Sequence, residues 1–140
     1  DDINPVLTGF LGGLKKFCAE TGFKPELIEQ ILYSAVYIFA GKIDIFGLLF
    51  NEPAIIDINP PNEDPVWALQ LGGYEQLVME WLAAHDRTME SLKLRRYALK
   101  LYPNSTYQLT PPYTNIFDRL NFLNCLSVAR LKQTLIKEAP

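Results

Sequence analysis

LIEQILYSAVYIFAGKIDIFGLL, residues 27–49, is the longest apolar block of the chain and decides its fold. Apolar side chains recur on nearly every side of a helical wheel, which is typical of a helix at the centre of a domain. A proline and a glutamate just before the block favour a helix start, and Gly41 favours a stop. We therefore predict a central helix over 25–41 and a second, short helix over 44–50.

The same block has to be tested as a membrane-spanning helix, which needs about 20 consecutive apolar residues. Its uncharged run ends at Gly41, and Lys42 and Asp44 follow. Each of these charges costs roughly 2.5–3.5 kcal/mol at hydrocarbon depth, so we predict no membrane span. The acidic start of the chain lacks the basic region of a signal peptide, and we expect an intracellular protein.

Size and composition fit one domain with its own core. The chain has 140 residues, of which 49% are hydrophobic and 21% charged, as in ordinary globular proteins. The net charge of −3 argues against strong non-specific nucleic-acid binding. Residues 1–70 carry ten acidic and four basic side chains, whereas residues 71–140 carry six acidic and nine basic ones. This asymmetry can mark a binding face or help the two halves attract each other.

Helix signals also occur before the apolar block. An Asn-Pro pair and a glycine at position 22 delimit a first helix over 5–21. Gly9, Gly12 and Gly13 weaken this helix, and glycines on a helix often permit close approach of another backbone. We expect such an approach here.

After the block, residues 52–65 contain four prolines and read as a loop, with a short strand allowed at 54–58. An Asp-Pro pair starts a helical element that Gly72 and Gly73 should break, and 74–84 is an amphipathic helix. The last helix begins near Asn115 and reaches about Lys137. We expect these of its residues to face inward: Ile116, Leu120, Leu123, Val128, Leu131 and Leu135.

Residues 88–101 fit two interpretations. Leu94, Ala98 and Leu101 share a helical stripe, whereas the alternation of side chains on both sides of 103–106 permits a hairpin. We prefer the helix. The predicted fold is therefore mainly α: a single compact, bundle-like domain of about five or six helices over residues 1–140, with a small β-hairpin near 99–109 as the alternative for that segment.

Catalytic signatures are missing from the sequence. His85 is the only histidine, and a zinc site built on it would need further ligands at fixed spacing. Cys18 and Cys125 form no C-x-x-C pair, and each falls in an apolar helical pattern typical of a buried cysteine. We expect no catalytic residue, no metal and no cofactor, with His85 at the end of a helix.

Two sets of residues are candidates for binding. A basic face would contact phosphates or an acidic partner, although a solvated helix face is the simpler interpretation; it comprises Lys93, Arg95, Arg96 and Lys100. Aromatic side chains beside proline-rich connectors are either binding anchors or lids over the core; they are Trp67, Tyr102, Tyr107 and Tyr113.

The absence of catalytic motifs and the high apolar content favour a non-catalytic protein–protein interaction or assembly module, an adaptor or scaffold domain. Its expected partner is another protein or a second copy of the chain. One alternative is a nucleic-acid-binding domain that uses the basic segment Lys93–Lys100. A further alternative is a carrier of a small apolar ligand, or an unfamiliar enzyme, with a pocket between helices.

Overall fold

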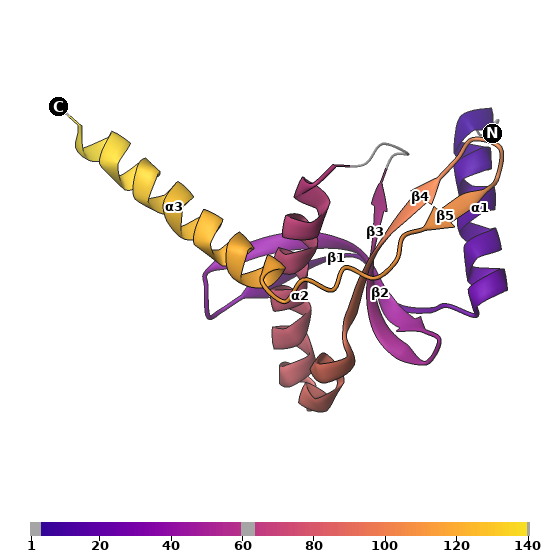
Figure 1. The fold of residues 1–140 in the computed structure, drawn as a ribbon, viewed down its shortest axis with the longest axis horizontal. Helices are drawn as coiled ribbons and strands as arrows, with labels where there is room; N and C mark the ends of the chain where they lie inside the picture. Colours follow the sequence, from indigo (N-terminus) through magenta and orange to yellow (C-terminus); the bar gives the residue numbers. More distant parts are fainter. Residues whose placement is uncertain (1–3, 60–63, 140) are drawn as a thin grey trace.

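The computed structural model describes residues 4–59 and 64–139, and it shows an α/β fold (Figure 1). Its helices are α1 (Pro5–Thr21), α2 (Val66–Ala84), α3 (Asp118–Glu138) and a short 3-10 helix, η1 (Thr88–Lys93). Its strands are β1 (Lys24–Ser34), β2 (Phe39–Leu49), β3 (Glu52–Asn59), β4 (Arg95–Leu101) and β5 (Tyr107–Leu109). The prediction of a mainly α bundle is therefore wrong.

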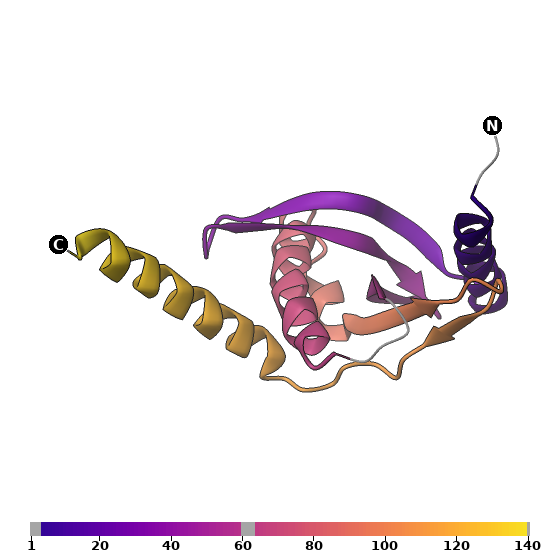
Figure 2. The ribbon, with the colours of Figure 1, turned by 90° about the horizontal axis from the view of Figure 1, so that it is seen from above.

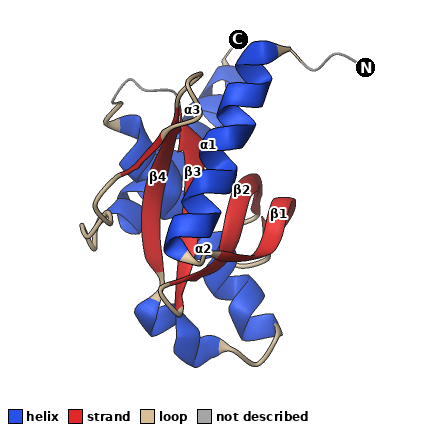
Figure 3. Cartoon of the chain, turned by 90° about the vertical axis from the view of Figure 1, so that its right-hand side faces the viewer, coloured by secondary structure: helices blue, strands red, loops and turns tan. Residues whose placement is uncertain are grey.

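The strands form one mixed sheet in the order β1-β2-β3-β4-β5. Neighbouring strands are antiparallel except β3 and β4, which are parallel. Parallel neighbours need a long crossover connection, and α2 supplies it. Helix α1 lies on one face of the sheet and α2 on the other (Figure 3), so the chain has three layers with a hydrophobic core on each side of the sheet.

The apolar block over 27–49 is a β-hairpin made of β1 and β2, not a central helix followed by a short one. It is rich in isoleucine and aromatic residues, which favour strands. Periodicity misleads in β2, because a strand that is covered on both faces reads as a continuous apolar run. Ile45 packs against the α1 core and its neighbour Phe46 against the α2 core, so both faces of β2 are apolar.

The turn of this hairpin contains no glycine, proline or asparagine, so the sequence gives no turn signal there. Ser34, which is fully buried, accepts a hydrogen bond from Ile38 N through its backbone carbonyl (2.9 Å). Its hydroxyl accepts a second one from Tyr37 N (2.9 Å). Ile38 adopts a φ of 56°, which is rare for a β-branched residue. The conformation of this turn is therefore imposed by its hydrogen bonds.

The first predicted helix is confirmed in α1. The Asn4 side chain accepts a hydrogen bond from Val6 N, and Gly22 ends the helix with a φ of 67°. The expected close approach is also present, because the turn between β4 and β5 lies against the glycine face of α1. A Cβ added to Gly9 would overlap the Pro103 carbonyl, and one added to Gly13 would lie 2.6 Å from the Thr106 oxygen.

Gly72 and Gly73 do not break a helix, contrary to the prediction, and α2 runs through both of them. They allow the start of α3 to pack against α2. A Cβ on Gly72 would lie 2.5 Å from the Asp118 carbonyl carbon, and one on Gly73 would lie 2.8 Å from the Phe122 ring. Close packing between helices explains both glycines.

Residues 88–101 are a 3-10 turn followed by strand β4, so the preferred helix is wrong and the alternative hairpin is correct. Strands β4 and β5 pair around 102–106, with Leu99 opposite Leu109 and Leu101 opposite Tyr107. The short strand allowed at 54–58 is confirmed within β3. Leu99 and Leu101 belong to the core under α1, which explains why this segment alternates.

We expect Gly9→Ala to lower the free energy of unfolding by about 2 kcal/mol, because the new methyl group has to displace backbone. In an open helix the same change would raise it by about 1 kcal/mol. Gly12→Ala is the milder comparison, since its new methyl group would press on the Ser105 Oγ (2.5 Å) and Cβ (2.8 Å) but stay 3.6 Å from the Ser105 backbone. Urea denaturation measures both variants, and a Gly9→Ala protein as stable as Gly12→Ala would contradict the close approach.

Candidate functional site

The four predicted basic residues do not share one helical face. Lys93 ends η1, and the other three lie in strand β4. Lys93 and Arg95 are exposed, while Arg96 and Lys100 are each only 5% exposed and point into the protein. Arg95 lies 3.7 Å from Glu52, measured between Nε and a carboxylate oxygen. Only Lys93 and Arg95 of this set are therefore placed where a phosphate could meet them.

Arg96 is the centre of a buried polar network. Its Nε lies 3.0 Å from a Glu75 oxygen, and its Nη1 lies 2.9 Å from Asp118 Oδ2. Its Nη2 donates to the carbonyl oxygens of Tyr113 (3.2 Å) and Asn115 (3.0 Å). Burial raises the pKa of Glu75, and the charge of Arg96 opposes that rise. The network joins β4, α2, the 110–117 connector and α3.

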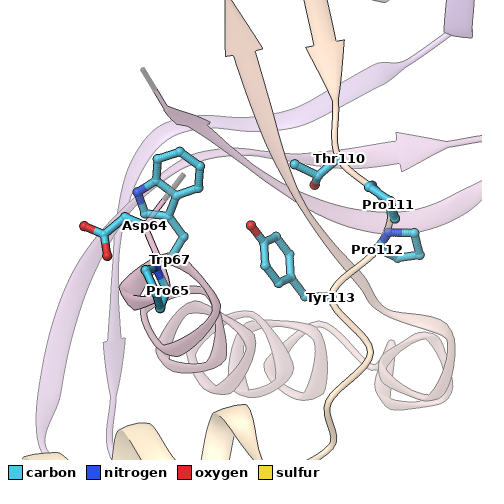
Figure 4. A pocket seen from close by; sticks show the side chains of 7 residues that line it. All are labelled: Asp64, Pro65, Trp67, Thr110, Pro111, Pro112 and Tyr113. Carbon is cyan, nitrogen blue, oxygen red and sulfur yellow. The ribbon is translucent and has the colours of Figure 1, made fainter. Parts of the chain in front are cut away.

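The four predicted aromatic residues separate into two places. Trp67 and Tyr113 lie on either side of a pocket of about 410 Å³, which Asp64, Pro65, Thr110, Pro111 and Pro112 also line (Figure 4). Tyr102 and Tyr107 instead belong to the β4–β5 hairpin. The hydroxyl of Tyr107 donates to Glu20 (2.6 Å), and its ring packs edge-on against Phe17. Tyr107 therefore joins the hairpin to α1.

The carboxylates of Asp44 and Asp57 lie close together at the point where the pairing of β2 with β3 ends. The pairing of these strands ends at Ile45 and Ile56, and just beyond it Asp44 Oδ2 accepts a hydrogen bond from Ile58 N (2.8 Å). Asp57 is buried beside Asp44. Its burial, the hydrogen bond with Asp44 and the charge of Asp44 raise the pKa of Asp57 to about 7, against a weaker lowering by Asn59.

The remaining candidates for chemistry lie apart. His85 caps the C-terminus of α2, as predicted, with Nδ1 2.7 Å from the Trp81 carbonyl oxygen. Cys18 packs against the α1 core, but Cys125 is exposed, contrary to the prediction. In the described part of the chain, no three histidine, cysteine, aspartate or glutamate side chains lie close enough to hold a metal ion.

No helix within residues 4–59 or 64–139 combines the length and the apolar character needed to cross a membrane. Helix α3 nevertheless leaves apolar side chains in water. Of its predicted inward residues only Leu123 is buried, and the others are between 45% and 79% exposed. The prediction that they line the core is wrong, because α3 extends away from the body beyond the tip of the β1–β2 hairpin (Figure 2).

Six exposed residues follow one line along α3 from its N-cap, and we call this line the α3 stripe. It consists of Phe117, Leu120, Asn124, Val128, Leu131 and Leu135. The five apolar members are 45–58% exposed, and Asn124 is exposed as well. The sequence contained the signal for this stripe, but an apolar stripe has the same pattern whether it faces a core or a partner.

The body of the protein holds the first half of α3 in place. Asp118 pairs with Arg96, and the Arg119 guanidinium donates to Gln76 Oε1 (2.8 Å). The rings of Phe122 and Phe39 pack with their centres 5.1 Å apart. Arg130 donates to the carbonyl oxygens of the hairpin turn at Tyr37 and Ile38. The α3 stripe is therefore presented in a defined orientation.

No family model matches the sequence, and no curated protein matches it. The function has to be inferred from the geometry.

We expect Arg96→Ala to lower the free energy of unfolding by about 3–5 kcal/mol, because it leaves the buried Asp118 and the partly buried Glu75 without their cation. Arg95→Ala, one residue away and exposed, should change it by no more than about 0.5 kcal/mol. Chemical denaturation of both variants measures the difference. Equal, small effects would contradict a structural role for Arg96.

We expect the contribution of Asp57 to the free energy of unfolding to fall by about 2–4 kcal/mol as the pH rises from about 4 to about 8. The folded chain binds the Asp57 proton more tightly than the unfolded chain, so this stability is present at low pH and is lost as the pH approaches 7. Asp57→Asn should flatten the profile, whereas Asp86→Asn, at an exposed turn, should not. Denaturation curves across this pH range decide, and an unchanged slope in Asp57→Asn would contradict the assignment.

Proposed function

We propose that this protein is a non-catalytic interaction or assembly module, and that the α3 stripe is its binding surface. The observation that carries the proposal is that the stripe is apolar, about half exposed and held in a defined orientation. Contiguous exposed apolar surface of this kind commonly marks an interaction site. The proposal departs from the sequence-based hypothesis in one respect, because the module is an α/β domain rather than a helical bundle.

The second half of α3 adds to this argument. Residues 127–139 are all exposed, so the core contributes little to their helical structure. Isolated helices shorter than about 12–15 residues are marginal in water, and most helical stability comes from packing of an apolar face. A partner on the α3 stripe would supply that packing. The arrangement corresponds to recognition through an amphipathic helix, in which side chains at i, i+3, i+4 and i+7 act as anchors.

The two alternatives predicted from the sequence have less support. Nucleic-acid binding through Lys93–Lys100 stays a prediction, and the burial of Arg96 and Lys100 removes two of its four contacts from the surface. For a carrier of a small apolar ligand, one candidate site is the pocket between Trp67 and Tyr113 (Figure 4). Trp67 itself is only 8% exposed, so little of its ring is available to such a ligand.

We expect a Val128→Asp/Leu131→Asp variant to lose its partner, because two charges would have to be buried in an apolar contact. Tagged wild-type protein and the variant are incubated with extract of the source organism, and the retained proteins are quantified by mass spectrometry. Wild type should retain its partner, either another protein or the untagged chain, at least about 10-fold better than the variant.

The matched control is Ala129→Asp/Gln133→Asp, which adds the same charges to α3 outside the stripe and should bind as wild type does. Both variants should unfold within about 0.5 kcal/mol of wild type, because all four positions are exposed. Retained proteins that are the same for wild type, variant and control would refute the α3 stripe as a binding surface.

A further inference from the structure

Strand β1 lies at the outer margin of the sheet, and among the described residues only β2 pairs with it (Figure 3). Its first half carries features that hinder the addition of a further strand. Pro25 has no N–H, the register with β2 shifts between Pro25 and Leu27, and Glu29 has a φ of 48°. The second half, residues 30–34, pairs with β2 without a register shift. It is therefore a regular, open strand edge.

The backbone of this open half points outward at Ile31 and Tyr33. In an antiparallel pair, successive residues turn their N–H and C=O alternately toward the partner strand and away from it. The Ser34 carbonyl points inward, because it accepts a hydrogen bond from Ile38 N within the hairpin. The Ile31 carbonyl points outward in agreement, since the exposed Gln30 side chain donates to it (3.4 Å). Backbone donors and acceptors spaced in this way are matched by another extended strand.

A pocket of about 320 Å³ runs along this edge. It lies between β1 with its turn and one face of α2, and we call it the β1–α2 groove; its lining residues are Ile31, Leu32, Tyr33, Ala35, Leu77, Glu80, Trp81 and Ala84. Neighbouring side chains of a strand point to opposite faces, so a pocket that contacts three consecutive residues of β1 lies at the edge of the strand. An open strand edge beside a helix suits peptide binding by β-strand addition, in which main-chain hydrogen bonds supply affinity and side-chain pockets supply specificity.

The α2 side of the β1–α2 groove carries a carboxylate. Glu80 accepts hydrogen bonds from Val36 N (3.3 Å) and from the Gln76 amide (2.9 Å). Burial acts to raise the pKa of Glu80, but these bonds and one from Ser34 lower it on balance. Glu80 is therefore ionised at neutral pH and has no cation among these partners.

The charges further along β1 are also mainly negative. Glu26 of β1 and Glu90 of η1 bind the same cation, Arg87, at 2.7 Å each. Lys42 lies 3.5 Å from Glu29. Counting Glu80, four carboxylates therefore meet two cations. Charge complementarity favours a basic partner, and a second copy of β1 has no cation between residues 30 and 34 to offer.

We propose that the β1–α2 groove binds an extended, basic peptide segment of a partner protein, which adds a strand to the sheet at Ile31 and Tyr33. Peptide side chains that point toward α2 contact Trp81 and Ala84, and a lysine or arginine side chain reaches Glu80. The groove is separate from the α3 stripe, so this proposal goes beyond the proposed function and does not depend on it.

The probe is a phage-displayed library of random eight-residue peptides, selected on the purified 140-residue chain. Enriched peptides should alternate apolar with other residues and contain lysine or arginine, and the best of them is synthesised for fluorescence anisotropy. Ala84→Arg should raise its dissociation constant at least about 10-fold, because the new side chain fills the groove and repels a basic peptide. Ala83→Arg, at an exposed neighbour outside the groove lining, is the matched control and should bind as wild type does.

Modified peptides test the mode of binding. An added strand uses the N–H of every second residue, so methylating the backbone nitrogens of one alternate set should abolish binding, whereas methylating the other set should change it by less than about 3-fold. Replacing the basic residue by norleucine should weaken binding to wild type by about 3- to 10-fold. The same replacement should have no effect on Glu80→Gln, which keeps an acceptor for Val36 N.

Each result decides one statement. Selection of no peptide, or of peptides without lysine or arginine, overturns the proposal. Equal losses in Ala84→Arg and Ala83→Arg overturn the β1–α2 groove as the site, and equal effects of the two methylated sets overturn strand addition. A dimer in light scattering that Ala84→Arg dissociates makes a second copy the occupant and also overturns the proposal. Val128→Asp/Leu131→Asp should bind the peptide as wild type does, which separates failure here from failure of the α3 stripe.

Discussion

The buried guanidinium of Arg96 is the interaction on which the arrangement of the helices depends. It takes one carboxylate from α2 and one from α3, and it also binds carbonyl oxygens of the connector between β5 and α3. Ion pairs buried in this way contribute little net stability, but removing one partner is costly because the remaining charges stay desolvated. The network therefore fixes where α3 begins and in which direction it runs.

Because the direction of α3 is fixed, its apolar face stays exposed to solvent. A mobile helix with apolar side chains would fold back onto the nearest apolar surface. Here the close packing of α3 on Gly72 and Gly73, together with the bonds from Arg130 to the hairpin turn, keeps the helix extended from the body. The fold supplies a rigid base, and α3 supplies the contact surface. This division of roles agrees with a protein that assembles rather than catalyses.

The bounds of α1 were predicted correctly because single residues at its two ends determine where the helix starts and stops. Asn4, Pro5 and Gly22 each act locally, and the glycines inside the helix indicated close packing correctly. The hairpin over 27–49 could not be recognised by periodicity, because strand β2 is covered on both faces and the turn at Ser34 uses no typical turn residue. Gly72 and Gly73 were misread because only tertiary packing distinguishes a helix break from a helix contact.

The candidate site was harder to predict than the fold. Arg96 and Lys100 looked like a surface face because the segment was read as a helix, and in a strand their side chains point to the interior. Four residues of the α3 stripe were singled out in the sequence but predicted to face the core: Leu120, Val128, Leu131 and Leu135. A local sequence pattern does not show whether the surface that covers an apolar helix face belongs to the same chain or to a partner.

The parallel pairing of β3 with β4 has a consequence for how the molecule is built. Strands β1 to β3 are joined by short turns and form from local contacts. Strand β4 can add to β3 only after α2 has spanned the sheet, and such non-local pairing is slow because a long loop must close first. The Arg96 ion pair that fixes the start of α3 needs β4 in place, so α3 is fully anchored only once β4 covers the β3 edge of the sheet.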